Sequence, residues 1–127
     1  MNEGDRPLIV CADDDAGIRE LVLFSLASFG YRVVFAADGA EAMRLAETLH
    51  PAVMILDVTM PGIDGFELTR RLRADSSTKD IPVMLLTSRA QPGDVARGYA
   101  LGANAYIKKP FALEELRREV RRLLSRA

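Results

Sequence analysis

The chain has 127 residues, of which 49% are hydrophobic and 28% charged, and its formal net charge is -1. This size and composition predict one globular domain over residues 1–127, with a polar tail at residues 1–7. The near-neutral charge disfavours direct binding to nucleic acid or membrane, and no apolar run approaches the ~20 residues of a membrane span. The N-terminus carries no signal-peptide pattern, and the single cysteine excludes an intrachain disulfide, so the composition points to the cytosol.

Short β-rich runs alternate with amphipathic stretches about five times, which is typical of a doubly wound α/β fold with a parallel sheet. The expected strands, in chain order, cover residues 8–12, 31–35, 53–56, 83–86 and 105–107. The expected helices cover residues 16–29, 39–49, 65–74, 92–101 and 113–125.

Local signals predict where helices begin and which of their faces are apolar. Asp38 with Glu41, and Asp64 with Glu67, have the spacing of capping boxes at the second and third helices. The last helix mixes arginine with glutamate, which favours a solvated face over a nucleic-acid surface. The expected apolar residues are Ile18, Leu21, Val22, Phe24, Ser25 and Leu26 in the first helix, Ala42, Leu45, Ala46 and Leu49 in the second, and Val95, Tyr99 and Leu101 in the fourth.

Polar side chains follow four of the expected strands, at the point where each strand ends. Because the carboxyl ends of parallel strands share one edge of the sheet, where ligands bind, we expect these groups to lie together. Carboxylates, a hydroxyl and an ammonium at one edge suit a cation and a phosphoryl group. The residues are Asp13, Asp14, Asp15, Asp57, Thr87, Ser88, Lys108 and Lys109.

The acidic turn after the first strand has two interpretations. It can cap the following helix, with Asp15 favoured by the helix dipole. Alternatively, Asp13 or Asp14 binds a cation together with Asp57, a backbone carbonyl and water, which are the oxygen ligands that Mg²⁺ takes. Asp57 and Lys109 at matching strand ends favour the Mg²⁺ site, in which Mn²⁺ can replace Mg²⁺.

Asp57 is the candidate nucleophile, because a carboxylate can attack phosphorus and form an acyl phosphate. Lys109 would bind one phosphoryl oxygen, and Thr87 would donate its hydroxyl to another. Lys108 competes for the ammonium role. Lys109 is favoured because Pro110 follows it, and a cis peptide bond there would aim the lysine at the site. The alternative for Thr87 is a hydroxyl that satisfies nearby backbone groups.

Together these residues resemble the receiver domain of bacterial two-component response regulators, over nearly the whole chain from Leu8 to about Leu124. Each motif alone is weak, whereas their order and spacing together are highly specific. The motifs are Asp13-Asp14, Asp57 with residues 60–65 (MPGIDG), residues 82–88, Gly102-Ala103 and Lys109-Pro110-Phe111.

The resemblance implies a flavodoxin-like fold, with five helices around a five-stranded sheet of order 2-1-3-4-5. Asp57 would accept a phosphoryl group from a sensor histidine kinase or a histidine phosphotransfer protein. Mg²⁺ would be bound by Asp13 or Asp14, by Asp57 and by the backbone carbonyl of Thr59. The chain would then be a phosphoacceptor signalling domain rather than an enzyme.

The family also implies a conformational switch, in which Thr87 moves toward the phosphoryl group and Tyr106 rotates inward. The fourth helix, fifth strand and fifth helix would form the output surface. Through that surface the domain would regulate a downstream protein target or an attached output domain.

Some positions vary within the family. Thr59 and Arg89 flank the expected route of an attacking water, and neither would orient it, so we expect slow to moderate self-dephosphorylation. Met60 and Ser88 are expected beside them at the rim of the site, and Ser88 is a near neighbour that competes with Thr87.

Receivers that dimerise ahead of a winged-helix DNA-binding domain usually carry two acids before the equivalent of Tyr106, and an arginine at the position of Glu119. Asn104, Ala105 and Glu119 break that charge pattern and weaken the case for such a dimer. We expect a monomer or a phosphorylation-dependent dimer.

The main alternative is a Mg²⁺-dependent phosphohydrolase with an Asp nucleophile. Such enzymes place a second Asp two residues after the nucleophile as general acid, where this chain has Thr59. A flavin-binding electron carrier would need a Ser/Thr/Gly-rich phosphate loop after the first strand, where the three aspartates at residues 13–15 would repel phosphate. Cys11 is expected in the core, and His50 as a surface cap at a helix end.

Overall fold

Five parallel strands form one sheet in the order β2-β1-β3-β4-β5, which confirms the order that the family resemblance implies. The computed structural model describes residues 6–125, so residues 1–5 of the predicted tail lie outside the described part. No helix within that part is long and apolar enough to cross a membrane. The strands are β1 (Leu8–Ala12), β2 (Arg32–Ala36), β3 (Val53–Leu56), β4 (Val83–Thr87) and β5 (Ala105–Lys108).

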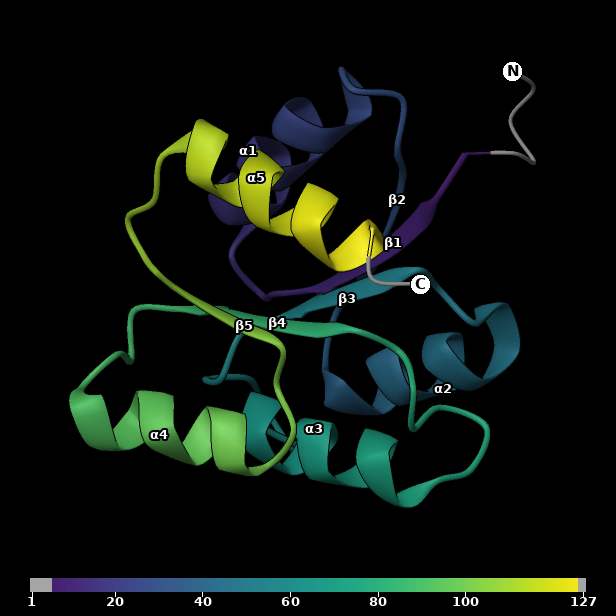
Figure 1. Ribbon diagram of the computed structural model, residues 1–127, viewed down its shortest axis with the longest axis vertical. Helices are drawn as coiled ribbons and strands as arrows, with labels where there is room; N and C mark the ends of the chain where they lie inside the picture. The colour runs from purple at the N-terminus through teal and green to yellow at the C-terminus, as the bar shows by residue number, and fades with distance from the viewer. Residues whose placement is uncertain (1–5, 126–127) are drawn as a thin grey trace.

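Helices cover both faces of this sheet. They are α1 (Ala16–Ala27), α2 (Gly39–Leu49), α3 (Gly65–Ala74), α4 (Pro92–Ala100) and α5 (Leu113–Leu124). α1 and α5 lie on one face, and α2, α3 and α4 lie on the other (Figure 1). All four residues of β3 are buried, as expected for a central parallel strand that is covered on both sides.

Each strand contributes side chains to two separate cores, because successive side chains point to opposite faces. In β1, Val10 and Ala12 pack on the side of α2 and α3, whereas Ile9 and Cys11 pack on the side of α1 and α5. Cys11 is therefore a buried core residue, as predicted. Burial raises the pKa of its thiol to about 12, so the thiolate is not formed at neutral pH.

Aspartate side chains begin the first three helices. Asp15 caps α1, and Asp38 and Asp64 cap α2 and α3 by accepting backbone N–H groups of the first turn at 2.8 to 3.2 Å. The reciprocal half of the predicted capping boxes is not formed. Glu41 instead accepts the N–H of the residue before the cap, and Glu67 pairs with arginines of its own helix. The caps therefore depend on the aspartates alone.

The broad apolar face predicted for α1 is only partly buried. Val22, Ser25 and Leu26 are buried, whereas Leu21 and Phe24 are 46% and 66% exposed. The buried residues follow the i, i+3, i+4 spacing of a narrow stripe, and the exposed ones flank it. The helix also ends at residue 27, earlier than the predicted end at residue 29.

Two more apolar residues are exposed against expectation. Leu49 is 40% exposed in the last turn of α2, just before His50, which ends the helix with a left-handed backbone (φ 47°) and so is a helix cap as predicted. Tyr99 of α4 is 48% exposed, because its ring lies against that of Tyr106, with 6.5 Å between ring centroids, instead of entering the core.

Arg73 of α3 ties several segments together at the amino-terminal edge of the sheet. Its guanidinium donates to the backbone carbonyls of Lys79, Ile81 and Gly102 at 2.8 to 3.0 Å, and to Oδ1 of Asn104 at 2.8 Å. The same Asn104 oxygen accepts the first N–H of β4 at 2.8 Å. Burial lowers the pKa of Arg73. We call this network the Arg73 clamp.

Candidate functional site

The register of the central strands brings two carboxylates together. Ala12 of β1 pairs with Leu56 of β3, so Asp13 and Asp57, the next residue of each chain segment, leave the sheet as neighbours. The N–H of Asp57 donates to the carbonyl of Ala12 at 3.0 Å. Both aspartates are nearly buried, with exposed fractions of 1% and 8%.

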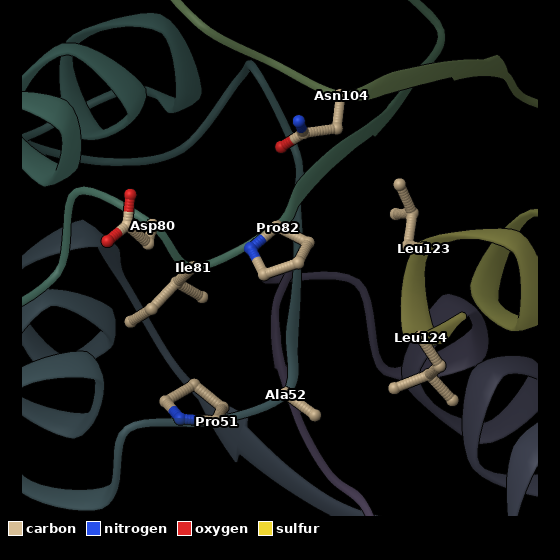
Figure 2. Close-up of a pocket in the computed structure, with 8 residues that line it drawn as sticks. All are labelled: Pro51, Ala52, Asp80, Ile81, Pro82, Asn104, Leu123 and Leu124. Carbon is tan, nitrogen blue, oxygen red and sulfur yellow. The ribbon is translucent and has the colours of Figure 1, made fainter. Parts of the chain in front are cut away.

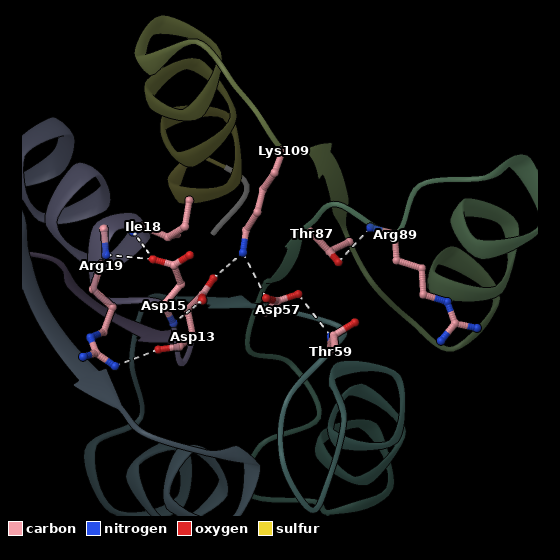
Figure 3. A network of polar contacts seen from close by, with 10 residues as sticks. Asp13, Asp15, Ile18, Arg19, Asp57, Thr59, Thr87, Arg89 and Lys109 are labelled. Atoms are coloured by element: carbon pink, nitrogen blue, oxygen red, sulfur yellow. Dashed lines mark hydrogen bonds and ion pairs between the residues drawn. The ribbon is translucent and has the colours of Figure 1, made fainter.

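Lys109 follows β5 and reaches both of these carboxylates (Figure 3). Its Nζ lies 2.7 Å from Asp13 Oδ2 and 2.9 Å from Asp57 Oδ2. Lys108 is exposed, so the structure places Lys109 and not Lys108 at the site. The bond between Lys109 and Pro110 is cis, as the sequence predicts. Burial lowers the pKa of Lys109, but the hydrogen bonds to the two aspartates outweigh it and hold that pKa above its usual value.

Asp14 joins Asp13 and Asp57, and ligand oxygens of all three lie within 4.8 Å of one another. Burial raises the pKa of Asp13, against the hydrogen bond from Lys109 that lowers it. Three carboxylates face one ammonium, so the cluster keeps an excess of negative charge. With Asp14 exposed, the cluster is open to solvent on one side. These hard oxygen donors suit a divalent cation such as Mg²⁺.

The acidic turn also caps α1, as the first interpretation of the turn predicts. Asp15 is the capping residue, and its N–H donates to Asp13 Oδ1 at 3.0 Å. Arg19 of α1 donates to the backbone carbonyl of Asp13 at 3.0 Å and holds the turn from the helix side. No local signal in the sequence marks Arg19, because its spacing of six residues from Asp13 matches no common motif.

The loop after β3 holds the second oxygen of Asp57. The N–H of Thr59 donates to Asp57 Oδ1 at 3.1 Å, and the Thr59 side chain is exposed beside the site. Met60 was predicted at the rim, but it is only 7% exposed and packs in the core on the α2 and α3 side. Met60 therefore packs in the core beside the loop and does not lie at the exposed rim. Ser88 is exposed at the end of β4.

Thr87 and Tyr106 both bond to the main chain of Arg89. Thr87 is fully buried, and its Oγ1 accepts the Arg89 N–H at 3.1 Å, while the Tyr106 hydroxyl donates to the Arg89 carbonyl. The Arg89 guanidinium points away from Asp57 (Figure 3). It pairs with Asp94, with Nε 2.9 Å from Oδ1. The Asp94 contact was not predicted from the sequence.

A cavity of about 350 Å³ lies at the opposite edge of the sheet from Asp57. Figure 2 shows that the last turn of α5 faces the segments that enter β3 and β4 across it. Its lining contains one carboxylate and one side-chain amide but no ammonium or hydroxyl, so it lacks the donor set found around Asp57. The lining residues are Pro51, Ala52, Asp80, Ile81, Pro82, Asn104, Leu123 and Leu124.

Residues 9–121 match the family model of the response regulator receiver domain. The chain belongs to this family. The receiver domain is 43% identical over 120 residues to the DNA-binding dual master transcriptional regulator RpaA of Synechocystis sp., across 94% of this chain and 50% of that protein. The chain thus spans about half the length of the curated relatives it matches.

Solved structures of receiver domains and response regulators have the same architecture. A putative response regulator from Chloroflexus aurantiacus superposes with a TM-score of 0.91 and 35% identity, over 95% of this chain and 99% of that one. The receiver domain of the Pseudomonas aeruginosa sensor histidine kinase PA1611, with magnesium coordinated in its active-site cleft, gives 0.87 and 32% over 94% and 98%. The comparisons give no support to the phosphohydrolase alternative.

Proposed function

We propose that Asp57 accepts a phosphoryl group from the phosphohistidine of a sensor histidine kinase or a histidine phosphotransfer protein. The observation that carries this proposal is the Lys109 ammonium, 2.9 Å from Asp57 Oδ2 and inside a cluster of three carboxylates. A phosphoryl group on Asp57 would place its oxygens within reach of that ammonium, which offsets their charge. The family match supports the same role.

The cluster fits Mg²⁺ as the cofactor of this transfer, with Mn²⁺ as a substitute that takes similar oxygen ligands. Asp13, Asp14 and Asp57 would supply the carboxylate oxygens, and the backbone carbonyl of Thr59 is the further ligand that the family implies. A bound Mg²⁺ supplies charge neutralisation for the incoming phosphoryl oxygens. The magnesium in the related PA1611 receiver domain supports this assignment.

During transfer, an Asp57 oxygen forms the new bond to phosphorus while the nitrogen–phosphorus bond of the phosphohistidine breaks. The electron pair of the broken bond returns to the imidazole. The Thr59 N–H and the Lys109 ammonium hold one Asp57 oxygen each, so the carboxylate is oriented before transfer. The domain is then a phosphoacceptor in signalling, one that assists its own phosphorylation and dephosphorylation.

Thr87 is the hydroxyl that would detect the phosphoryl group. Its Oγ1 accepts the Arg89 N–H, which leaves its own proton available to donate to a phosphoryl oxygen. Tyr106 would respond as the second switch residue and change the surface built by α4, β5 and α5. That surface would regulate a protein target or an attached output domain. The name of RpaA supports a DNA-binding output in longer relatives, with no direct DNA contact by the receiver itself.

The α4–β5–α5 surface weakens the case for the dimer of receivers that precede a winged-helix domain, and we propose a monomer or a phosphorylation-dependent dimer. Arg122 pairs with Glu119 within the same helix at 2.9 Å, and also donates to the backbone carbonyl of Asn104 at 3.0 Å. The Asn104 side chain faces inward to the Arg73 clamp. Charges that would cross a dimer interface are therefore engaged inside the chain.

Two further assignments belong to this proposal. Self-dephosphorylation is slow to moderate, because neither the Thr59 hydroxyl nor the Arg89 guanidinium, held by Asp94, is a group that orients an attacking water. A phosphoryl half-life of only seconds would contradict it.

We assign residues 1–127 to one receiver domain. Its proposed partner, a histidine kinase, and its single cysteine, the buried Cys11, both favour the cytosol.

The deciding experiment is intact-mass measurement after incubation with acetyl phosphate and Mg²⁺. We expect wild type to gain one phosphoryl group, and the gain to disappear with EDTA and in Asp57→Asn. Asp80→Asn is the matched control, because it removes an exposed carboxylate at the opposite edge of the sheet. A gain retained by Asp57→Asn would overturn the proposal.

A further inference from the structure

The backbone N–H and the backbone carbonyl of Arg89 each bond to one of the two proposed switch side chains. Its N–H donates to Thr87 Oγ1 at 3.1 Å, and its carbonyl accepts the hydroxyl of Tyr106. A movement of the Arg89 backbone would therefore act on Thr87 in β4 and on Tyr106 in β5 together. The contacts that fix the Arg89 backbone would therefore influence the switch.

The Arg89 side chain provides that hold through α4 and α3. Its Nε donates to Asp94 Oδ1 at 2.9 Å, and the Asp94 side chain is 16% exposed whereas the Arg89 side chain is 49% exposed. Its guanidinium carbon lies 5.4 Å from the ring centroid of Phe66, and the guanidinium carbon of Arg97 lies 4.5 Å from the same ring. Arg89 is thus fixed by an ion pair and by a cation–π contact, which favour one orientation.

Asp94 also belongs to the first turn of α4, where its second oxygen accepts the Gln91 N–H at 3.1 Å. The same carboxylate therefore bonds to the start of α4 and to the loop before it. A displacement of α4 would be transmitted to Arg89 through Asp94. The reverse holds as well, because the coupling between two linked elements is reciprocal.

We propose that Asp94 and Arg89 are positioning residues, which together hold the peptide that sets the orientations of Thr87 and Tyr106. This inference deepens the proposed function and rests on it for the role of the two switch residues. The ion pair makes the orientation of Tyr106 depend on the position of α4. Loss of the Asp94 charge frees the Arg89 side chain and loosens Tyr106, while Asp57, Lys109 and the acidic cluster stay as they are.

The test follows Tyr106 in the unphosphorylated domain by NMR of ¹³C-labelled tyrosine rings. The chain has three tyrosines, so Tyr106→Phe assigns the signals. We expect Asp94→Asn, which keeps an oxygen for the Gln91 N–H, and Arg89→Met to shift the Tyr106 signals in the same direction. The double variant shows no shift beyond that of Arg89→Met, because the Asp94 carboxylate acts on Tyr106 through Arg89.

Two variants keep the test independent of misfolding. Arg89→Lys retains a positive charge for Asp94 and is expected to restore the wild-type signals in part. Glu67→Gln removes a carboxylate from another ion pair, with Arg70 and Arg71 on α3, and is expected to leave Tyr106 unchanged. Tyr106 signals in Asp94→Asn that coincide with wild type, or an equal shift in Glu67→Gln, would overturn the inference.

Acetyl phosphate with Mg²⁺ then separates this inference from the proposed function. If Asp57 accepts no phosphoryl group, wild type and Asp94→Asn both show no response to acetyl phosphate, whereas the shift between them without phosphate remains. If both ideas hold, phosphorylation moves the Tyr106 signals less in Asp94→Asn than in wild type. An equal response in the two proteins counts against the positioning role.

Discussion

Buried charge is compensated differently at the two edges of the sheet. At the amino-terminal edge, the Arg73 guanidinium has four acceptors within 3.0 Å, three of them backbone carbonyls. At the carboxyl-terminal edge, three carboxylates converge within 4.8 Å, and two of them, Asp13 and Asp57, share the ammonium of Lys109. One cation donates four hydrogen bonds to neutral acceptors, whereas a group of anions is only partly neutralised.

This difference separates a stabilising network from a binding site. Partly buried polar groups add to stability when they have partners, as the four acceptors of the Arg73 guanidinium do. The repulsion among Asp13, Asp14 and Asp57 destabilises the domain when no cation is bound, and it therefore favours the binding of one. The contrast leads to four predictions, ordered from the largest expected effect to the smallest.

Breaking the clamp should cost the most. Arg73→Met removes the donors of four hydrogen bonds and leaves half-buried carbonyls without partners, so we expect a loss of roughly 3 kcal/mol in the free energy of unfolding. Urea denaturation measures it. Arg71→Met on the same helix removes only an exposed ion pair and should change stability by less than about 0.5 kcal/mol. Equal losses in the two variants would mean that the clamp stabilises the domain no more than an exposed ion pair does.

Filling the carboxylate cluster should stabilise the domain without touching the clamp. With Mg²⁺ a hundredfold above its dissociation constant, the gain in unfolding free energy should be about 2.7 kcal/mol. Thermal unfolding with MgCl₂ and with EDTA measures it, and NaCl of matched ionic strength is the control. In Asp13→Asn we expect a much smaller gain, because a buried ligand is lost. A full gain from NaCl alone would point to general screening.

Neighbouring aspartates at the acidic turn should respond with opposite signs. Asp15→Ala removes the cap of α1, whose oxygen accepts two N–H groups, and should cost about 1 kcal/mol. Asp14→Ala removes like-charge repulsion and should raise stability in Mg²⁺-free buffer, with the advantage lost on adding Mg²⁺. Urea midpoints with and without Mg²⁺ measure both. A loss of stability in Asp14→Ala without Mg²⁺ would contradict the repulsion argument.

A carboxylate in the Arg73 clamp should change the free energy of unfolding little. Asn104→Asp keeps an oxygen for the Arg73 guanidinium and for the first N–H of β4, so we expect a change within about 0.5 kcal/mol. The new charge would face a cation that already lies 2.8 Å from that oxygen. A large loss would show that the clamp requires a neutral partner. Thermal unfolding at neutral pH is sufficient to decide.

Local patterns in the sequence determined the strands, the helix caps and the edge at which the polar groups meet. Asp38 and Asp64 bond to N–H groups three residues away, so their spacing along the chain is enough to predict them. Asp13, Asp57 and Lys109 are far apart in the chain, but each follows a parallel strand, and such strands end at a common edge. The family resemblance added the strand order and the roles of Thr87 and Tyr106.

Tertiary structure alone decided which side of each element faces a neighbour. Leu21 and Phe24 are as apolar as the buried residues of α1, yet they stay exposed, and within residues 6–125 no element covers that side of the helix. The Arg73 clamp joins Arg73 to Asn104, 31 residues away, and neither residue carries a local signal of the contact. The direction of the Arg89 side chain depends in the same way on Asp94 and Phe66. These contacts depend on which surfaces pack together, which no spacing along the chain specifies.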